Sequence, residues 1–294
     1  MNKIYLLFLL TLGIAVGAQA QTTSESRATN TVSPLLNDVW IAPKWHGYVQ
    51  LSQTAIYAQQ FYEAEGSVQD MTTAGFYSTE LSGRLGLGSN LEVSLQAPLF
   101  VRATRNAVRF RSSQRVQAGD QVNTIGDMTV GVKYGLINRK SFVLSGSLLL
   151  GVPTGTTQGG ESQLLQTGDG EFNQIIGLDI GYAISSFYVT GGVGFNNRTN
   201  SFSDEIRANA GIAWAYNRFL AMVQANMVHS LNNGTASATP ENIFSNNVRY
   251  VTITPKLAFA ITQKLTFNAS VGAIVSGQNM LKAPVYNTGV LFQF

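Results

Sequence analysis

The sequence contains no cysteine, and only 12% of its residues are charged. A chain without cysteine can form neither a disulfide scaffold nor a cysteine-ligated metal site. Because soluble domains carry about 25% charged residues, the low charge indicates an unusual amount of apolar surface. No internal stretch has 18 consecutive apolar residues, which excludes a helical protein with several membrane spans. The charges are scattered along the chain, which argues against disorder and against a nucleic-acid-binding tail.

The first 20 residues have the pattern of a secretory signal peptide. Lys3 gives a positive start, residues 4–16 form an apolar core, and Ala18-Gln19-Ala20 matches a small-x-small cleavage site. The core is too short to span a bilayer as a helix. We therefore expect residues 1–20 to be removed and the mature chain, beginning at Gln21, to be exported.

The mature chain alternates apolar and polar residues almost throughout. From Leu91 to Val101, for example, every second residue is apolar. Such residues share one face of a strand, and about ten residues let a tilted strand cross a bilayer. The runs lie near residues 45–61, 72–86, 90–102, 125–137, 142–153, 172–184, 187–196, 205–216, 219–229, 248–261, 265–275 and 285–294. They predict an all-β fold, a transmembrane antiparallel up-and-down β-barrel of about 12 strands over residues 45–294.

The connections between the predicted strands alternate between short and long. Tight turns follow the even-numbered strands, and polar loops follow the odd-numbered ones, the longest being 103–124. This rhythm is typical of outer-membrane barrels and places both termini on the periplasmic side. Aromatic residues flank the short turns, as expected at a membrane interface: Tyr134, Phe142, Tyr182, Phe187, Trp214, Tyr216 and Phe219. A soluble β-sandwich also alternates, but it requires no such loop rhythm.

The C-terminus carries a further signal. Gly289, Phe292 and Phe294 stand in the order glycine, two residues, aromatic, any residue, aromatic, ending at the last residue. This segment resembles the terminal insertion signal of bacterial outer-membrane proteins. The resemblance implies that Phe294 closes the barrel and that the barrel assembly machinery reads the segment during insertion. We therefore expect the protein in the bacterial outer membrane.

Residues that could carry chemistry are few. The two histidines are His46 and His229, and Ser230 follows the second. An outer-membrane lipid hydrolase would need a histidine within hydrogen-bond reach of a serine. Neighbours in a strand point to opposite faces unless a bulge intervenes, so a polar strand end is the simpler interpretation. The sequence shows no metal-ligand spacing and no phosphate-binding loop, and we expect no enzyme activity, metal or cofactor.

The inward-facing side chains are the best candidates for function. By strand parity ten charged residues point inward, five of each sign, which argues against a strongly ion-selective pore. They are Glu80, Arg84, Glu92, Arg102, Asp127, Lys133, Asp179, Glu205, Arg207 and Lys256. Twelve strands lie between a filled barrel of eight and an aqueous channel of 16, so these residues either line a passage or fill the interior. Inward glycines such as Gly135 and Gly181 give up side-chain volume and favour an open lumen.

Two segments lie where they could close or screen such a lumen. Residues 21–44, before the first strand, are either a periplasmic leader or a plug within the barrel. The outer loop 103–124 carries Arg105, Arg109, Arg111 and Arg115. Arginine binds phosphate and carboxylate well because its planar fork donates in pairs. We favour contact with lipopolysaccharide phosphates over a sieve for anionic solutes.

Three segments suggest a family. They are GLGSNLEVSLQAPLF (86–100), GDMTVGVKYGLI (126–137) and a longer one from GVPTG (151–155) to TGDG (167–170) and onward to Tyr182. Together they resemble the outer-membrane transporter family named after phenol meta-cleavage pathways. The resemblance implies a channel for small, often hydrophobic or aromatic, solutes, and it transfers no ligand residue. We expect an outer-membrane channel; the alternatives are a lipid hydrolase using His229 and Ser230, or a sealed structural or adhesion barrel. The solute and the oligomeric state stay open.

Overall fold

The computed structural model describes residues 39–109 and 114–294. The predicted signal peptide, most of segment 21–44 and Arg111 lie outside the described residues. The strands are β1 (Gly47–Tyr62), β2 (Val68–Gly86), β3 (Leu91–Arg105), β4 (Val108–Arg109), β5 (Val116–Gln117), β6 (Asp120–Thr124), β7 (Met128–Asn138), β8 (Phe142–Val152), β9 (Asn173–Ile184), β10 (Phe187–Arg198), β11 (Glu205–Tyr216), β12 (Phe219–Ser230), β13 (Arg249–Ala260), β14 (Leu265–Gln278), β15 (Met280–Lys282) and β16 (Val285–Gln293). Within these ranges no helix is long and apolar enough to cross a membrane.

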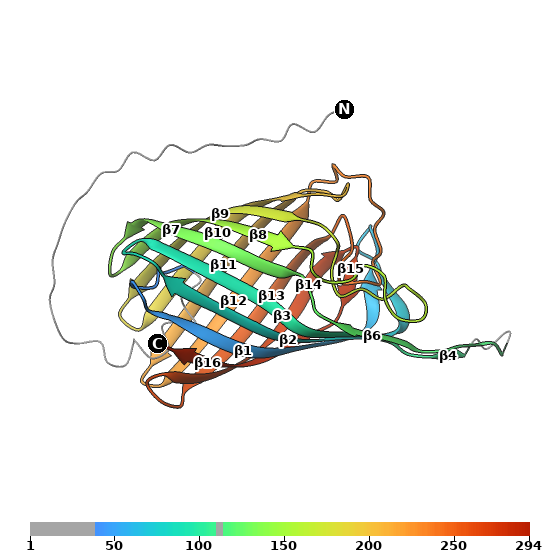
Figure 1. The fold of residues 1–294 in the computed structure, drawn as a ribbon, viewed down its shortest axis with the longest axis horizontal. Helices are drawn as coiled ribbons and strands as arrows, with labels where there is room; N and C mark the ends of the chain where they lie inside the picture. The colour runs from blue at the N-terminus through green and yellow to red at the C-terminus, as the bar shows by residue number, and fades with distance from the viewer. Residues whose placement is uncertain (1–38, 110–113) are drawn as a thin grey trace.

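Twelve long strands close into an antiparallel barrel (Figure 1). Consecutive long strands pair around the wall, and β16 returns to β1 in a register that runs from Tyr48 opposite Gln293 to Ile56 opposite Val285. The short β15 continues this seam by pairing with the end of β1. The predicted 12-stranded barrel is therefore confirmed.

The outer face of the barrel is apolar. Along β9, for example, Ile176, Leu178 and Ile180 are exposed and alternate with inward residues. Aromatic residues form an exposed ring beside the short turns, and the rings of Trp214 and Tyr216 stack with centroids 5.6 Å apart. On a closed barrel such a belt with an aromatic girdle faces lipid, so the barrel spans the bacterial outer membrane.

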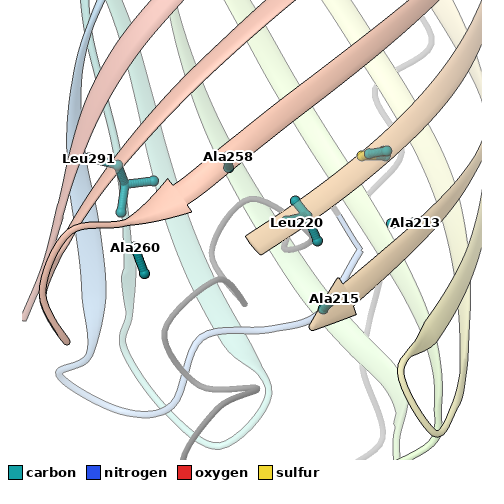
Figure 2. Packing of buried hydrophobic residues seen from close by; sticks show 7 residues of the cluster. Ala213, Ala215, Leu220, Ala258, Ala260 and Leu291 are labelled. Carbon is teal, nitrogen blue, oxygen red and sulfur yellow. The ribbon is translucent and has the colours of Figure 1, made fainter. Parts of the chain in front are cut away.

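The two ends of the barrel differ. The end that carries the tight turns and the C-terminus is called the short-turn end, and the opposite one the long-loop end (Figure 1). The inner wall near the short-turn end is apolar. Figure 2 shows Leu220 and Leu291 there, beside small side chains at strand ends. This cluster also contains Ala213, Ala215, Met222, Ala258 and Ala260.

The predicted loop 103–124 is in large part strand. β3 runs on to Arg105 and pairs with β6, and the small hairpin β4–β5 projects beyond them (Figure 1). The connection after β1 is likewise shorter than predicted, only residues 63–67, because β1 and β2 extend beyond the membrane-crossing length. Where both faces of a hairpin are exposed to water, apolar and polar residues need not alternate. The alternation therefore did not predict that these strands extend beyond the membrane-crossing length.

A bulge in β3 reverses the inward and outward faces. The register between β2 and β3 shifts at Thr79/Glu80, so that Leu99 and Phe100 are both exposed and Val101 is only 1% exposed. The prediction that Leu91 to Val101 share one face is therefore wrong beyond Leu99. Pro98, which cannot donate to the ladder, stands directly before the bulge.

Candidate functional site

The interior of the barrel contains a chamber of about 700 Å³. Its lining mixes polar and apolar side chains and comes from strands all around the wall. Residues that line it include Tyr48, Ser82, Arg84, Glu92, Ser94, Gln96, Thr129, Lys133, Ser147, Asp179, Arg207, Asn209, Gln224, Asn226, Tyr250, Thr252, Thr254, Ser270 and Asn287. A barrel of this size can therefore hold both paired charges and free volume.

Three ion pairs join six of the residues predicted to line the lumen. Arg84 Nη1 lies 3.5 Å from Glu92 Oε1, and Lys133 Nζ lies 3.3 Å from Asp179 Oδ2. Arg207 Nη2 lies 2.8 Å from Glu205 Oε2. Five of the six side chains line the chamber itself. The charges of the wall are thus largely neutralised in pairs, as the balance of signs suggests.

The other four predicted lumen residues lie elsewhere. Glu80 and Lys256 face inward and are half-buried, outside the chamber lining. Asp127 lies beneath loop 153–172. Arg102 follows the bulge and is exposed on the outer wall, where its Nη2 donates to Gln121 Oε1 at 2.9 Å. The prediction that Arg102 faces inward was wrong, because counting alternate residues does not account for the extra residue that a bulge inserts into the strand.

Residues 39–42 enter the barrel at the short-turn end. The backbone N–H of Ala42 donates to Glu92 Oε2 at 2.8 Å, and Ser145 Oγ donates to the carbonyl of Val39 at 3.3 Å. The ring of Trp40 meets Tyr188 edge to face, with centroids 5.8 Å apart. Since Val39, Ile41 and Ala42 are buried, this end of the lumen is occupied by the chain itself.

Two inward glycines make room for that segment. A β-carbon at position 181 would lie 2.8 Å from Cη2 of Trp40, and one at position 135 would lie 3.1 Å from Cγ1 of Ile41. The volume that these glycines give up is therefore filled by residues 40 and 41. Their expected contribution to an open lumen was wrong at these two positions.

At the long-loop end, residues 231–248, called the mouth loop, cross the opening. Phe244 meets Phe76 of β2 edge to face, with ring centroids 6.0 Å apart. Ile243 packs against a cluster formed by Ala58, Leu281 and Ala283. Because β1 and β2 do not adjoin β12 or β13 in the wall, the loop reaches across the barrel. Its Asn242 Nδ2 also donates to Gln166 Oε1 of loop 153–172 at 2.7 Å.

Loop 153–172 is tied down by the residues that carry the family resemblance. Asp127 accepts hydrogen bonds from the backbone N–H groups of Gly155 and Asp169, both at 2.8 Å. Thr154 Oγ1 donates to the carbonyl of Gly126 at 2.6 Å. A β-carbon at position 168 would lie 2.2 Å from Asp127 Oδ1, so only glycine allows the approach. Three separate motifs thus form one hydrogen-bonded unit.

A buried charge cluster lies beside this unit. Arg198 forms ion pairs with Glu171 and, at 2.8 Å, with Glu205 Oε1, while Asp169 Oδ2 lies 3.4 Å from its Nη2. Burial raises the pKa of Glu171 to about 8 despite the attraction of Arg198. Sequence reasoning missed Arg198, although inward parity continues from Asn196 to Arg198, because the predicted strand ended at residue 196.

A second pocket of about 250 Å³ lies between the mouth loop and the chamber. Asp169, Arg198 and Glu205 of the charge cluster line it, together with Ser245. Its apolar lining comes from Ile56, Val228, Ile243, Phe244, Val248, Ile274, Met280, Leu281, Ala283 and Val285. Arg207 and Tyr250 line both this pocket and the chamber. Both cavities therefore present polar and apolar side chains together. No sequence pattern pointed to Phe244 or Ile243, because they lie in a polar loop.

The remaining candidates are widely separated. His229 is exposed on the outer face and Ser230 is buried on the inner face, and Ser230 Oγ instead accepts from the N–H of Asn232 at 3.2 Å. His46 is exposed at the short-turn end. Arg105 is half-buried, whereas Arg109 and Arg115 are exposed in the region of the projecting hairpin. In residues 39–109 and 114–294 no group of three His, Cys, Asp or Glu side chains could hold a metal ion.

The C-terminal signal residues lie in the seam. Phe292 and Phe294 are exposed on the outer face, and Gly289 faces inward, where a β-carbon would lie 3.0 Å from Nε2 of Gln50. The backbone N–H and carbonyl of Phe294 both bond to Gly47 at 3.1 Å. The last residue therefore joins the barrel to the start of β1, in the position that the signal implies.

Solved structures share this architecture at low sequence identity. The COG4313 outer membrane channel from Pseudomonas putida F1 is 11% identical, with a TM-score of 0.64 over 88% of this chain and 98% of that chain. The NanC porin is 10% identical, with a TM-score of 0.51 over 84% and 100%. The translocator domain of the autotransporter NalP from Neisseria meningitidis is 11% identical, with a TM-score of 0.50 over 91% and 94%. These similarities establish the fold. No curated protein matches the chain significantly.

The sequence itself identifies the family. The profile of the family described as the MetA pathway of phenol degradation matches residues 53–284, which is most of the chain and all but the ends of the barrel. The match includes the three motifs that hold loop 153–172, and it confirms the resemblance noted from them. The chain belongs to this family of the MetA pathway of phenol degradation.

Proposed function

We propose that this protein is an outer-membrane channel through which small solutes, including hydrophobic ones, diffuse. The observation that carries the proposal is the chamber of about 700 Å³ inside a closed barrel, lined by polar and apolar side chains together. The described segment 39–42 lies at one end and the mouth loop at the other. We propose that both yield when a solute passes, which makes this a gated channel, with the short-turn end in the periplasm and residues 21–44 acting as a plug.

Two features support passage of solutes rather than a sealed structural barrel. The ion pairs of the chamber leave free volume between Arg84 and Arg207 instead of a packed apolar core. The family is named for phenol degradation, and the P. putida structure with the same fold is described as a channel. A mixed-sign lining predicts weak selectivity between cations and anions.

Single-channel recording in planar bilayers tests the proposal. The refolded wild-type protein and a variant lacking residues 21–44 would be compared at the same protein density. We expect discrete current steps that are larger or more frequent in the deletion variant, with little preference between potassium and chloride. If neither protein conducts under any applied voltage, the barrel is sealed and the channel proposal fails.

The enzyme alternative receives no support from the geometry. His229 and Ser230 point to opposite faces of β12, so these two residues do not form a dyad. We therefore infer that the protein is not a lipid hydrolase. Equal release of fatty acid from phospholipid or lipid A by the wild type and by His229→Ala would agree with this. A hydrolase activity that the substitution abolishes would support the enzyme alternative instead.

We further propose that the protein contacts two partners, lipopolysaccharide in the membrane and the barrel assembly machinery during insertion. The arginines of the β3–β6 region, Arg105, Arg109 and Arg115 among the described ones, contact lipopolysaccharide phosphates, and the terminal Gly289, Phe292 and Phe294 are read by the barrel assembly machinery. Replacing Arg105 and Arg109 by alanine should lower the lipopolysaccharide that co-purifies, and Phe294→Ala should slow insertion in cells.

A further inference from the structure

We propose that the outer wall, at the long-loop end of β12, β13 and β14, carries a binding site for one phosphorylated, acylated lipid of the outer leaflet, the lipid A part of lipopolysaccharide. This site is separate from the arginines of the β3–β6 region and from the passage through the barrel. It rests on the proposed orientation of the channel, with the short-turn end in the periplasm. Its basis is the order of outward side chains across the three strands, the pocket that they line and the sign of the charge there.

Three polar side chains form a row, called the donor row, across these strands on the outer face. His229 of β12 stands opposite Arg249 of β13, and Arg249 stands opposite Gln278 of β14. Since neighbouring strands are about 4.8 Å apart, the donor row extends across about 10 Å. Imidazole, guanidinium and amide groups all donate hydrogen bonds, and a guanidinium can pair with phosphate through two parallel bonds. The donor row therefore suits a phosphate group.

The next outward positions toward the short-turn end are largely apolar. Met227 stands opposite Val251, and Val251 stands opposite Ser276. The register between β13 and β14 shifts at this point, so that Val275 is an extra residue in β14, and it is 55% exposed. An inserted residue bends its strand. Apolar side chains therefore lie directly below the donor row on a bent part of the wall.

A pocket of about 470 Å³ joins the two rows. All six of their residues line it, as does Val275. The rest of its lining comes from the inward positions that alternate with them and from the end of the β1–β2 hairpin, namely Val228, Tyr250, Gly277, Tyr62 and Gly66. Donors at one edge and apolar side chains at the other match a lipid that has a charged head group and acyl chains.

The charge of the pocket is positive. None of the residues that line it is acidic, and in the part of the chain that the structure describes no carboxylate forms an ion pair with Arg249. Glu63, in the turn that contributes Gly66, accepts hydrogen bonds from Ser67 Oγ and Gln69 Nε2. Basic groups at a membrane surface attract anionic head groups, so an anionic lipid fits this site better than a neutral one.

The donor row lies at the membrane interface opposite the short-turn end. Phe219, on the same face of β12 as His229, belongs to the aromatic ring beside the short turns and contacts Phe259, with ring centroids 4.9 Å apart. At about 3.4 Å per residue and a strand tilt of about 40°, His229 lies about 26 Å from Phe219 along the barrel axis. The apolar band of outer-membrane barrels is about 25 Å tall. In the proposed orientation the donor row therefore reaches the level of the lipid A phosphates.

Native mass spectrometry of the full-length protein, titrated in detergent, tests the site. The probes are diphosphorylated lipid A, the same lipid without its phosphates, and inorganic phosphate. We expect diphosphorylated lipid A to bind about tenfold more tightly than the dephosphorylated lipid, and a large excess of inorganic phosphate to displace neither. Equal binding of the two lipids would refute the phosphate contact. Displacement by inorganic phosphate would reveal a simple anion site and overturn the lipid assignment.

Substitutions on the outer wall separate the head-group contact from the acyl-chain contact. Arg249→Gln should weaken binding of diphosphorylated lipid A about tenfold and leave the dephosphorylated lipid unchanged. Its matched control is Arg218→Gln, in an exposed position at the short-turn end, which should change neither. Val275→Asn should weaken both lipids by a similar factor, whereas Val152→Asn, exposed at the long-loop end of β8, should weaken neither. The site is refuted if Arg249→Gln and Arg218→Gln behave alike.

Two comparisons separate this inference from the other proposals. The loss caused by Arg249→Gln should persist when Arg105 and Arg109 are replaced by alanine. If it disappears in that background, both sets of arginines hold the same lipid and the separate site is refuted. Binding is measured without any current, so a barrel that fails to conduct leaves this test intact, and a barrel that conducts does not by itself support the site.

Labelling of intact cells tests the orientation on which the site rests. Because the chain has no cysteine, Leu164→Cys, at a position 62% exposed in loop 153–172, supplies a single thiol. We expect a maleimide that is too large to cross the outer membrane to label it in intact cells. Labelling only after lysis would place the donor row in the periplasmic leaflet and overturn the assignment to lipid A, whether or not the barrel conducts.

Discussion

Gly181 of β9 lies directly against the indole of Trp40, so that a β-carbon at position 181 would stand 2.8 Å from Cη2. The two residues come from distant parts of the sequence, and the contact exists only because residues 39–42 lie inside the barrel. Gly181 is thus a direct probe of that segment, since a side chain there must either displace the indole or distort the wall.

Gly181→Val should displace Trp40 from the lumen. We expect a larger single-channel current than in the wild type and a red shift in tryptophan emission as the indole becomes wetter. The matched control is Gly191→Val on the neighbouring strand, where a β-carbon would meet only ordinary contacts, the nearest at 3.6 Å. An unchanged current in both variants would mean that residues 39–42 do not limit passage.

Raising the pH should loosen loop 153–172. Burial raises the pKa of Glu171 from 4.5 to about 8, so the folded protein holds a proton that the unfolded chain has lost between these values. Stability therefore falls as pH rises through this window and levels off above about 8. We expect faster hydrogen exchange in residues 167–171 at pH 9 than at pH 6, after correction for intrinsic rates. Glu171→Gln should abolish the difference, whereas the exposed Glu161→Gln should preserve it.

Asp120 should anchor the turn of loop 153–172 down to strongly acidic pH. Its carboxylate accepts hydrogen bonds from Ser162 Oγ and from the N–H groups of Gln121, Glu161 and Ser162. These bonds, that of the Ser162 hydroxyl foremost, lower its pKa to about 2. The stabilisation is complete above the ordinary value of 3.8 and is lost as pH falls through about 2. Asp120→Asn should speed amide exchange at residues 161 and 162 at neutral pH; Asp204→Asn should not.

Replacing Arg198 should destabilise the protein far more than replacing Arg207. Removing a buried ion-pair partner leaves uncompensated charge and costs about 3–5 kcal/mol, and Arg198→Gln would leave three acidic groups without their shared guanidinium. The side chain of Arg207 is 40% exposed, so Arg207→Gln should cost about 0–1 kcal/mol. Reversible guanidinium unfolding of the lipid-reconstituted barrel measures both, and equal losses would contradict the ranking.

The barrel wall was predictable because each residue in it obeys a local rule. Lipid on one side and a polar lumen on the other impose a period of two, as Ile176, Leu178 and Ile180 show, and the prediction of 12 strands follows from that pattern alone. Inward parity places Lys133 of β7 and Asp179 of β9 on the same side of the wall, but their ion pair across β8 could not be predicted from parity.

The interior closures were not predictable in the same way. The bulge after Pro98 moved Arg102 to the outer wall, because one inserted residue reverses parity for the rest of the strand. The contact between Phe244 and Phe76 joins a polar loop to the far wall, and neither residue stands in a repeating pattern. Long-range contacts of single side chains depend on the path of a loop, and local sequence does not encode that path.

The pairing of β1 with β16 has a consequence for how the protein assembles. Gly47 bonds to Phe294, so the ladder that closes the wall joins the first and last strands of the barrel, which are separated by all the other strands. Such a join has a high loop-closure cost and cannot form before residue 294 has been made. Until then β1 and the other outermost strand each present an unpaired edge, which would invite association with other chains. The incomplete barrel must therefore be kept apart from other chains from the export of residue 47 until residue 294 arrives.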